Sequence, residues 1–471
     1  MLFNSYTFLF FLLAVFSLYY LPQFKKHQVL YLVGVSLIFY AWEYPIYLLL
    51  LLISAGINIF VSYRLVHTVK QNVQKKWVTG GVVLNLGILC FFKYGRLVSD
   101  TLLDPGTDVG SFLLQLPLPI GISFFTFEGI SLLVDVYKGR KVEAFQSIVT
   151  RSLWQHSNNV LLFITFFPHL IAGPILKAHD FIPQIKTKRI SKIDWRFCFR
   201  HLVLGYFLKM VIADNLKDQT FWIQYPYFEG HSSFTLLMLL LGYSAQIFAD
   251  FAGYSLIALG LAGLFGYRLE ENFNFPYIAA SFSEFWRRWH ISLSSFLREY
   301  LYIPLGGNRK GPLRTYANLM ITMFLGGLWH GAAWSYAIWG VFHGLALATE
   351  RFLKNYIALP HNIVIRFMKR FMIFGFVSLA WLLFKLPDFS HVVKYVQAIF
   401  MNTNRDNDFA LTTYILFYTV PIFLYHGLYL IKSTPFYEWI FRKPEFIWYG
   451  VLLFFILTNS GSQGSFIYFQ F

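Results

Sequence analysis

The stretch Gly326–Gly344 reads GGLWHGAAWSYAIWGVFHG, and its only acidic or basic side chains are those of His330 and His343. An imidazole in a hydrophobic run of a membrane protein is costly when charged, which favours a functional role. Histidine also exchanges its proton near neutral pH, as acid–base chemistry requires. The alternative is a core histidine bonded to a backbone carbonyl. Glycines on both sides of His330 favour a broken helix that admits a substrate.

The composition of the whole chain places this stretch in a membrane. Of the 471 residues, 57% are hydrophobic and only 13% are charged, which excludes a soluble protein. About twelve apolar segments follow one another without a long polar linker. We therefore predict an all-α polytopic fold with one integral membrane domain over residues 1–471. Walker, GxGxxG, GxSxG, CxxC and HExxH motifs are absent from the sequence, so we predict no metal and no permanently bound cofactor.

The formal charge of +16 comes from lysines and arginines in the loops between apolar runs. We attribute it to the positive-inside rule and to contact with anionic lipid or substrate, and we expect no nucleic acid partner. Basic loops alternate with neutral or acidic ones along the first five runs, which places the N-terminus outside the cytoplasm. The first run, Tyr6–Leu21, lacks the features of a cleaved signal peptide and is expected to be a retained helix.

Three later segments depart from simple crossings. Val160–Leu176 has basic sequence on both sides and is interrupted by proline and glycine, which predicts a re-entrant pair of half-helices or two tightly coupled short helices. Lys209 lies within an apolar crossing and needs a partner or must reach the interface. Phe234–Phe265 is too long for one straight span, and we predict a bend at Gly253.

The segment Phe282–Tyr300 has apolar residues at helical spacing, which predicts one amphipathic helix at the cytoplasmic interface. His290 falls at the edge of its apolar stripe, whereas Arg287, Arg288 and Arg298 project elsewhere. A lipid-surface helix with an incidental histidine is the alternative. A buried imidazole and clustered arginines suit acyl transfer, because the imidazole takes a proton from an acceptor hydroxyl that attacks a thioester. The arginines would then bind the phosphates of a CoA donor or anchor the membrane surface.

Five sequence blocks within residues 119–344 recur in the order of a known family. They are PIGISFFTFEGISLLVDVYKG (Pro119–Gly139), FFPHLIAGPI (Phe166–Ile175), FADFAGYS (Phe248–Ser255), NFNFPYIAASFSEFWRRWHISLSSFLREYLYIPLGGNRKG (Asn272–Gly311) and LWHGAAWSYAIWGVFHG (Leu328–Gly344). The chain thus resembles the membrane-bound O-acyltransferase (MBOAT) family, close to its bacterial alginate and peptidoglycan O-acetyltransferase branch. The resemblance implies a ring of about 11–13 helices, some re-entrant or interfacial, around a central funnel. It also implies that His330 is the catalytic histidine and His290 the second motif position.

The last six residues, 466–471, read F-x-Y-x-x-F. They resemble a terminal motif of bacterial acyl-export proteins, which implies that Tyr468 carries the acyl group. A phenol can attack a thioester and later act as a leaving group. An aromatic anchor at the membrane interface is the alternative reading of the same residues.

These observations predict an O-acetyltransferase of the bacterial inner membrane with a periplasmic N-terminus. It would pass acetyl from cytoplasmic acetyl-CoA, through His330, His290 and Tyr468, to an exported alginate-like polysaccharide. The expected partners are acetyl-CoA, membrane lipids and a periplasmic SGNH-type acetyltransferase or similar polysaccharide-modification protein. Peptidoglycan or another envelope glycan is the alternative acceptor, and D-alanyl transfer is less favoured. A non-catalytic transporter or an assembly scaffold is the alternative of another class.

Overall fold

A computed structural model describes residues 1–103, 106–139, 148–150, 152–171, 173–354, 356, 360, 362–462, 464 and 466. The regular elements within these residues are all helical, which confirms the predicted all-α class. Five helices in the described part of the chain are long and apolar enough to cross a membrane: α3 (Tyr47–His67), α4 (Gln71–Leu102), α11 (Ser233–Leu264), α16 (Ile363–Lys385) and α18 (Phe409–Leu430). Shorter apolar helices are α1 (Tyr6–Tyr19), α2 (Gln28–Ala41) and α20 (Glu445–Thr458).

The chain divides into two compact units. Unit 1 comprises Met1–Leu202 and Ile257–Glu270, and unit 2 comprises Val203–Leu256 and Glu271–Phe471. The 32-residue helix α11 therefore contributes its first part to unit 2 and its end to unit 1. The predicted single membrane domain stays a prediction.

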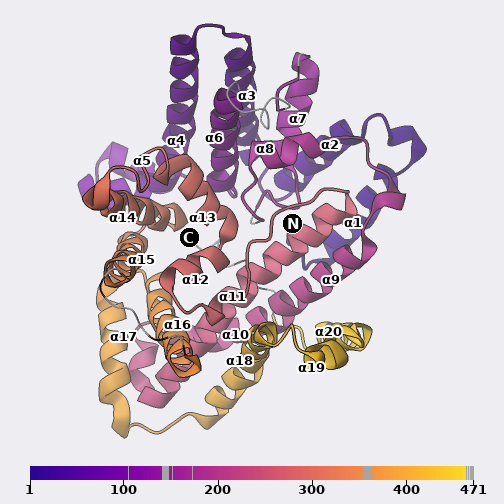
Figure 1. The fold of residues 1–471 in the computed structure, drawn as a ribbon. Coiled ribbons are helices and arrows are strands. Elements are labelled where there is room, and N and C mark those ends of the chain that lie inside the picture. The colour runs from indigo at the N-terminus through magenta and orange to yellow at the C-terminus, as the bar shows by residue number, and fades with distance from the viewer. Residues whose placement is uncertain are drawn as a thin grey trace. The chain divides into compact units, whose positions relative to one another are not determined.

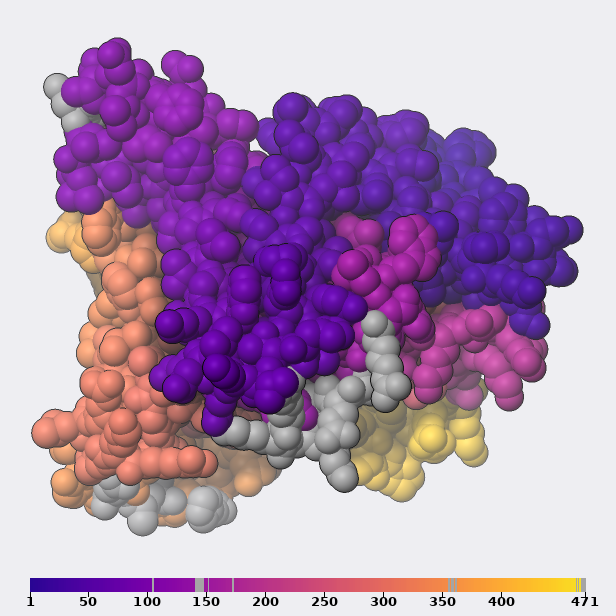
Figure 2. Space-filling view, turned by 90° about the horizontal axis from the view of Figure 1, so that it is seen from above, coloured from indigo at the N-terminus to yellow at the C-terminus, as the bar shows by residue number. Residues whose placement is uncertain are grey.

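Unit 1 is built around the neighbouring helices α3, α4 and α6, which lie side by side in Figure 1. Asn58 of α3 and Asn85 of α4 exchange side-chain hydrogen bonds of 3.1 and 3.0 Å, so two polar side chains satisfy each other between apolar helices. Figure 2 shows the surface of these N-terminal helices in indigo and violet. The remaining helices of this region are α5 (Asp108–Gln115), α6 (Ile122–Gly139), α7 (Leu153–Thr165), α8 (Ala178–Phe181) and α9 (Trp195–Tyr206).

The segment predicted to be re-entrant is helical only in its first part. Helix α7 ends at Thr165, and the described residues from Phe166 to Lys177 have no regular helix. Their backbone is supported inside the protein, since the amide of Phe167 donates to Oγ of Ser36 at 3.2 Å. Irregular buried backbone is what the prolines and glycine predict, but the second half-helix is reduced to the four residues of α8. The side of the membrane on which this segment opens stays a prediction.

Unit 2 contains three of the five family blocks and both predicted catalytic histidines, His290 and His330. Its helices include α10 (Asp214–Gln219), α12 (Phe282–Arg288), α13 (Ile291–Leu297), α14 (Gly311–His330), α15 (Trp334–Leu353), α17 (Phe389–Met401) and α19 (Pro435–Tyr437). Helix α11 runs through Gly253 without the expected interruption. The glycine serves a close approach instead, because a Cβ there would lie 2.9 Å from the Gly205 carbonyl oxygen and from the Lys209 amide nitrogen.

Lys209 has the partners that its apolar surroundings require. It lies in the π-helical segment Phe207–Ala213, and its Nζ is 2.7 Å from a carboxylate oxygen of both Asp214 and Asp250. An extra residue in a helical turn of this kind redirects side chains and is frequent at functional sites. The prediction that Lys209 needs a partner is confirmed.

Candidate active site

The helical hairpin α14–α15 carries His330 at its turn. Helix α14 ends at His330, Gly331 is extended (φ −162°, ψ 158°), and α15 begins at Trp334. The two helices are neighbours in Figure 1, and glycines allow their backbones to approach closely. A Cβ on Gly327 would lie 3.0 Å from Cα of Gly340, so a larger side chain has no room. The predicted break beside His330 is confirmed.

The imidazole of His330 lies against aromatic rings and is only 4% exposed. Ring centroids of Trp329, Trp339 and Phe384 lie 5.2, 5.1 and 5.1 Å from its own. The ring of His290 lies 6.2 Å away. The two histidines that the sequence singled out are therefore brought together, and the aromatic wall keeps water from one side of them.

His290 lies in a tight turn, and the prediction of one continuous helix over Phe282–Tyr300 is wrong. Helix α12 ends at Arg288, His290 has a left-handed backbone (φ +44°), and α13 starts at Ile291. The reason is Asn272, eighteen residues earlier, whose backbone carbonyl accepts from the Ile291 amide at 2.9 Å. This contact across the chain replaces the hydrogen bonds that a continuous helix would make.

Asn272 also fixes the protonation pattern of His290. Its Oδ1 accepts from the amide of Ser292 at 3.2 Å, which identifies that atom as oxygen, and it lies 3.1 Å from Nδ1 of His290. Nδ1 of His290 therefore donates, and the lone pair of the neutral ring lies on Nε2. This role of Asn272 could not be predicted from local sequence, although the residue begins one of the five family blocks.

A cavity of about 470 Å³ in unit 2 has His330 in its wall. It is lined by apolar side chains near the histidine, including Trp339, and by three arginines: Arg298, Arg309 and Arg351. Such a cavity offers an apolar channel for a thioester and cations for phosphates. Arg309 and Arg351 were not predicted, because only the fold shows that the segment after α13 and the end of α15 line the same space.

The other two arginines of the prediction lie elsewhere. Arg287 is exposed, and neither it nor Arg288 is among the residues lining this cavity. Arg288 is held by Glu284, at 2.9 Å, and donates to the carbonyl oxygen of Asn274 at 3.0 Å. Their assignment to the donor phosphates stays a prediction, whereas Arg298 has the position that such a role needs.

Glu350 of α15 holds the N-terminus of α12 in place. Its carboxylate accepts from the amides of Phe282 and Ser283 and from the Ser283 hydroxyl, and it pairs with Lys354. An acidic group at the first turn of a helix satisfies amides that lack intrahelical partners. The helix that leads to His290 is thereby tied to the helix that follows His330.

The C-terminal segment approaches the histidines through Phe466. Tyr468 itself lies outside the described residues. Phe466 is 1% exposed, and its ring lies 4.7 Å from that of Tyr254 and 5.8 Å from that of Phe251. The ring of Phe251 in turn meets His290 edge-on at 4.6 Å. The start of the F-x-Y-x-x-F motif is therefore one aromatic ring away from His290.

His343 is buried among aromatic rings rather than placed beside His330. Its centroid lies 4.6 Å from Trp339 and 5.2 Å from Trp286. Neither ring nitrogen has a hydrogen-bond partner among the described residues. Within the same residues, no group of three or more His, Cys, Asp or Glu side chains is placed to hold a metal ion.

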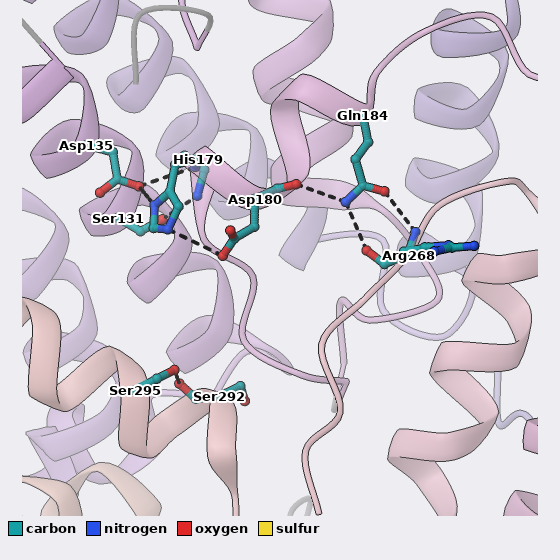
Figure 3. A network of polar contacts seen from close by, with 9 residues as sticks. Ser131, Asp135, His179, Asp180, Gln184, Arg268, Ser292 and Ser295 are labelled. Carbon is teal, nitrogen blue, oxygen red and sulfur yellow. Dashed lines mark hydrogen bonds and ion pairs between the residues drawn. The ribbon is translucent and has the colours of Figure 1, made fainter. Parts of the chain in front are cut away.

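Among the described residues of unit 1, His169 and His179 each pair with a carboxylate. Nε2 of His169 lies 2.6 Å from Glu128, and both side chains are fully buried. Nδ1 of His179 lies 2.7 Å from Asp135, and Figure 3 shows this pair with Asp180 beside it. Burial lowers the pKa of His179, but the hydrogen bond and charge of Asp135, with the charge of Asp180, outweigh burial and raise it overall.

These pairs connect helix α8, and the irregular segment that precedes it, to helix α6. The hydroxyl of Ser131 on α6 accepts from the amide of Ala178, and Gln184 bonds the backbone of Arg268 in both directions. The cavity beside Asp180 has a volume of only about 20 Å³. This arrangement holds the chain in position and leaves little room for a substrate.

Comparison with known proteins identifies the family. The model of the MBOAT, membrane-bound O-acyltransferase family, matches residues 107–392, well over half of the chain. The chain belongs to the membrane-bound O-acyltransferase family. It is therefore an acyltransferase, and the family together with the five long apolar helices makes it a multi-pass membrane protein.

Several curated proteins are similar to this MBOAT chain over most of their length. The probable alginate O-acetylase AlgI of Pseudomonas aeruginosa is 40% identical over 410 residues, which cover 85% of this chain and 75% of that protein. The peptidoglycan O-acetyltransferase of Helicobacter pylori is 33% identical and covers 100% of this chain and 98% of its own. The teichoic acid D-alanyltransferase of Bacillus subtilis is 29% identical over 58% of this chain and 70% of that protein.

Proposed function

We propose that this MBOAT protein transfers acetyl groups from cytoplasmic acetyl-CoA across the bacterial inner membrane to an exported, alginate-like polysaccharide. The observation that carries the proposal is the cavity whose wall contains His330 and whose lining includes three arginines. The relatives named for alginate and peptidoglycan O-acetylation support the acetyl group and an envelope glycan as acceptor. Peptidoglycan is the second candidate, because the relative named for it matches the whole chain.

In the proposed reaction, His330 acts as general base. It takes the proton of the attacking hydroxyl while that oxygen forms a bond to the thioester carbonyl carbon. The carbon–sulfur bond breaks, the CoA thiolate leaves, and the proton on the imidazole passes to that thiolate. His290, oriented by Asn272, presents Nε2 to position the hydroxyl or share the proton. Arg298, Arg309 and Arg351 bind the donor phosphates.

The attacking hydroxyl in this proposal is the phenol of Tyr468. Burial of Phe466 next to Phe251, and of Phe251 next to His290, supports it, because Tyr468 is only two residues farther along the chain. In the second step the acetyl leaves the phenol oxygen for a hydroxyl of a periplasmic partner or glycan, and the phenol recovers its proton. The partner is an SGNH-type acetyltransferase in this scheme, and the N-terminus is periplasmic.

The test uses purified full-length protein and isotopically labelled acetyl-CoA. Peptide mass analysis should find the label on Tyr468 in the wild type, and none there in His330→Ala or Tyr468→Phe. Tyr437→Phe serves as the matched control, because it removes a phenol from the short helix α19, and it should keep the label. Acetyl-CoA consumption that survives Tyr468→Phe would contradict the relay and keep the acetyltransferase. A wild type that neither binds nor consumes acetyl-CoA would contradict the donor.

A further inference from the structure

A second, polar cavity of about 280 Å³ lies in unit 2 and takes no part in the proposed donor chemistry. Three lysines, Lys209, Lys217 and Lys385, line it together with the carboxylates Asp214 and Asp250. Gln224, Gln246, Tyr243 and Tyr336 add further polar groups to the lining. Its polar lining contrasts with the largely apolar lining of the cavity beside His330, which is called the donor cavity below.

The charges in this cavity do not balance. Nζ of Lys209 lies 2.7 Å from an oxygen of each carboxylate, and Asp214 also interacts with the charge of Lys217, so three ammonium groups share two carboxylates. Lys217 and Lys385 are half-buried, and neither forms an ion pair within the described parts of the chain. Nζ of Lys385 lies 5.3 Å from the centroid of the Tyr243 ring. Two ammonium groups that share a low-dielectric cavity favour an anion between or beside them.

The cavity also lies near both parts of the reaction site. Tyr336 and Phe384 form part of its lining, and the ring of Phe384 is 5.1 Å from that of His330. On another side is the C-terminal segment, where a Cβ on Gly464 would lie 3.2 Å from Nζ of Lys217. A ligand in this cavity would therefore lie one aromatic ring from His330 and beside the segment that leads to Tyr468.

We propose that this cavity binds a carboxylate-bearing sugar unit of the acceptor, with Lys217 and Lys385 as its cationic partners. The amide of Gln246 has its oxygen fixed by the hydroxyl of Thr220 at 2.5 Å, so its NH₂ group remains a donor for sugar hydroxyls. Tyrosine and glutamine groups around two cations match a small polyhydroxylated anion better than a lipid tail. The role of the bound sugar as acceptor rests on the proposed acetyl transfer. Its binding can be tested separately, because binding needs no acetyl donor.

The experiment measures binding by calorimetry with the purified full-length protein and without acetyl-CoA. The probes are a uronic acid trisaccharide, a neutral trisaccharide of the same length, and inorganic phosphate. We expect the uronate to bind and the neutral sugar to bind at least tenfold more weakly. Lys217→Gln with Lys385→Gln should weaken uronate binding by about tenfold or more, as expected for lost charge-assisted hydrogen bonds.

Two variants keep this result interpretable. Lys385→Arg retains the charge and should retain uronate binding, and Lys443→Gln removes an exposed lysine elsewhere in unit 2 and should change nothing. Equal affinity for the acidic and neutral sugars, or uronate affinity unchanged in the double variant, would overturn the proposal. Phosphate that binds more tightly than the uronate would overturn the acidic sugar in favour of a phosphoryl group. Uronate binding without acetyl transfer would contradict the proposed function alone.

Discussion

The two units each bury a histidine, and the surroundings of these histidines differ in kind. In unit 1, His169 is paired with Glu128 at 2.6 Å, and both side chains are fully buried. In unit 2, His330 lies in the wall of a cavity of about 470 Å³, with aromatic rings and His290 nearby. A carboxyl group that bonds an imidazole in a closed core holds two segments of the chain together and is costly to remove, whereas an imidazole beside a cavity has access to a substrate.

Removal of the two imidazoles should separate these roles most clearly. We expect His330→Ala to lower the rate of acetyl transfer by about 10²- to 10⁴-fold, the usual contribution of a general base. His169→Gln should leave the rate per folded molecule within a few-fold of wild type, since His169 is fully buried against Glu128. Turnover of labelled acetyl-CoA, normalised to the folded fraction from size-exclusion chromatography, measures both. Equal losses of transfer rate in the two variants would contradict the assignment of a catalytic role to His330 and a structural role to His169.

The arginines of the donor cavity should produce the next largest effect. Arg298→Gln together with Arg351→Gln removes two of the three cations from its lining. We expect the KM for acetyl-CoA to rise about 10- to 100-fold with little change in kcat, because the role proposed for these groups is to bind phosphates far from the reacting carbon. Arg287→Gln is the matched control, since Arg287 is exposed outside the cavity. A larger KM effect from Arg287 would favour the prediction made from sequence over the cavity.

The converse experiment concerns stability and targets unit 1. Glu128→Gln removes the carboxyl group that bonds His169 in a fully buried place, and weakening such a buried hydrogen bond costs roughly 1–3 kcal/mol. Thermal unfolding in detergent should therefore show a clearly lower Tm than wild type. Glu128→Gln combined with His169→Gln should recover part of the loss, because two amides can bond each other. An unchanged Tm in the single variant would mean that the pair contributes nothing to the fold.

Features set by neighbouring residues could be predicted from the sequence, whereas features set by residues far away in the chain could not. The break at His330 was predictable because glycine spacing is a local signal. That Lys209 has an ion-pair partner was predictable because a buried ammonium group requires one. The turn at His290 was not, since local periodicity favours a helix and the deciding hydrogen bonds come from Asn272. Gly253 was predicted to bend its helix, but it instead allows close contact with a helical segment that is far away in the sequence.

The arginines illustrate the same limit at the site itself. Arg287, Arg288 and Arg298 are close in sequence and were grouped for that reason. Only Arg298 is among the residues lining the donor cavity, where Arg309 and Arg351 join it from two other segments. A cluster of charges in sequence indicates a basic surface, but which of them share one cavity depends on how separate helices pack.

The smallest expected effect tests whether the second pair of unit 1 is also a structural contact. The pKa of His179 is raised in the folded protein by Asp135 and Asp180, although burial and Lys177 oppose this. Its contribution to stability is therefore fully present below the unfolded pKa of about 6.5 and is lost as the pH rises through the folded value. We expect the Tm of wild type to fall modestly between pH 6 and pH 8, and His179→Asn to remove part of that slope. A slope identical in the variant would show that His179 does not stabilise the fold through its charge, and the contrast between the units would then rest on His169 alone.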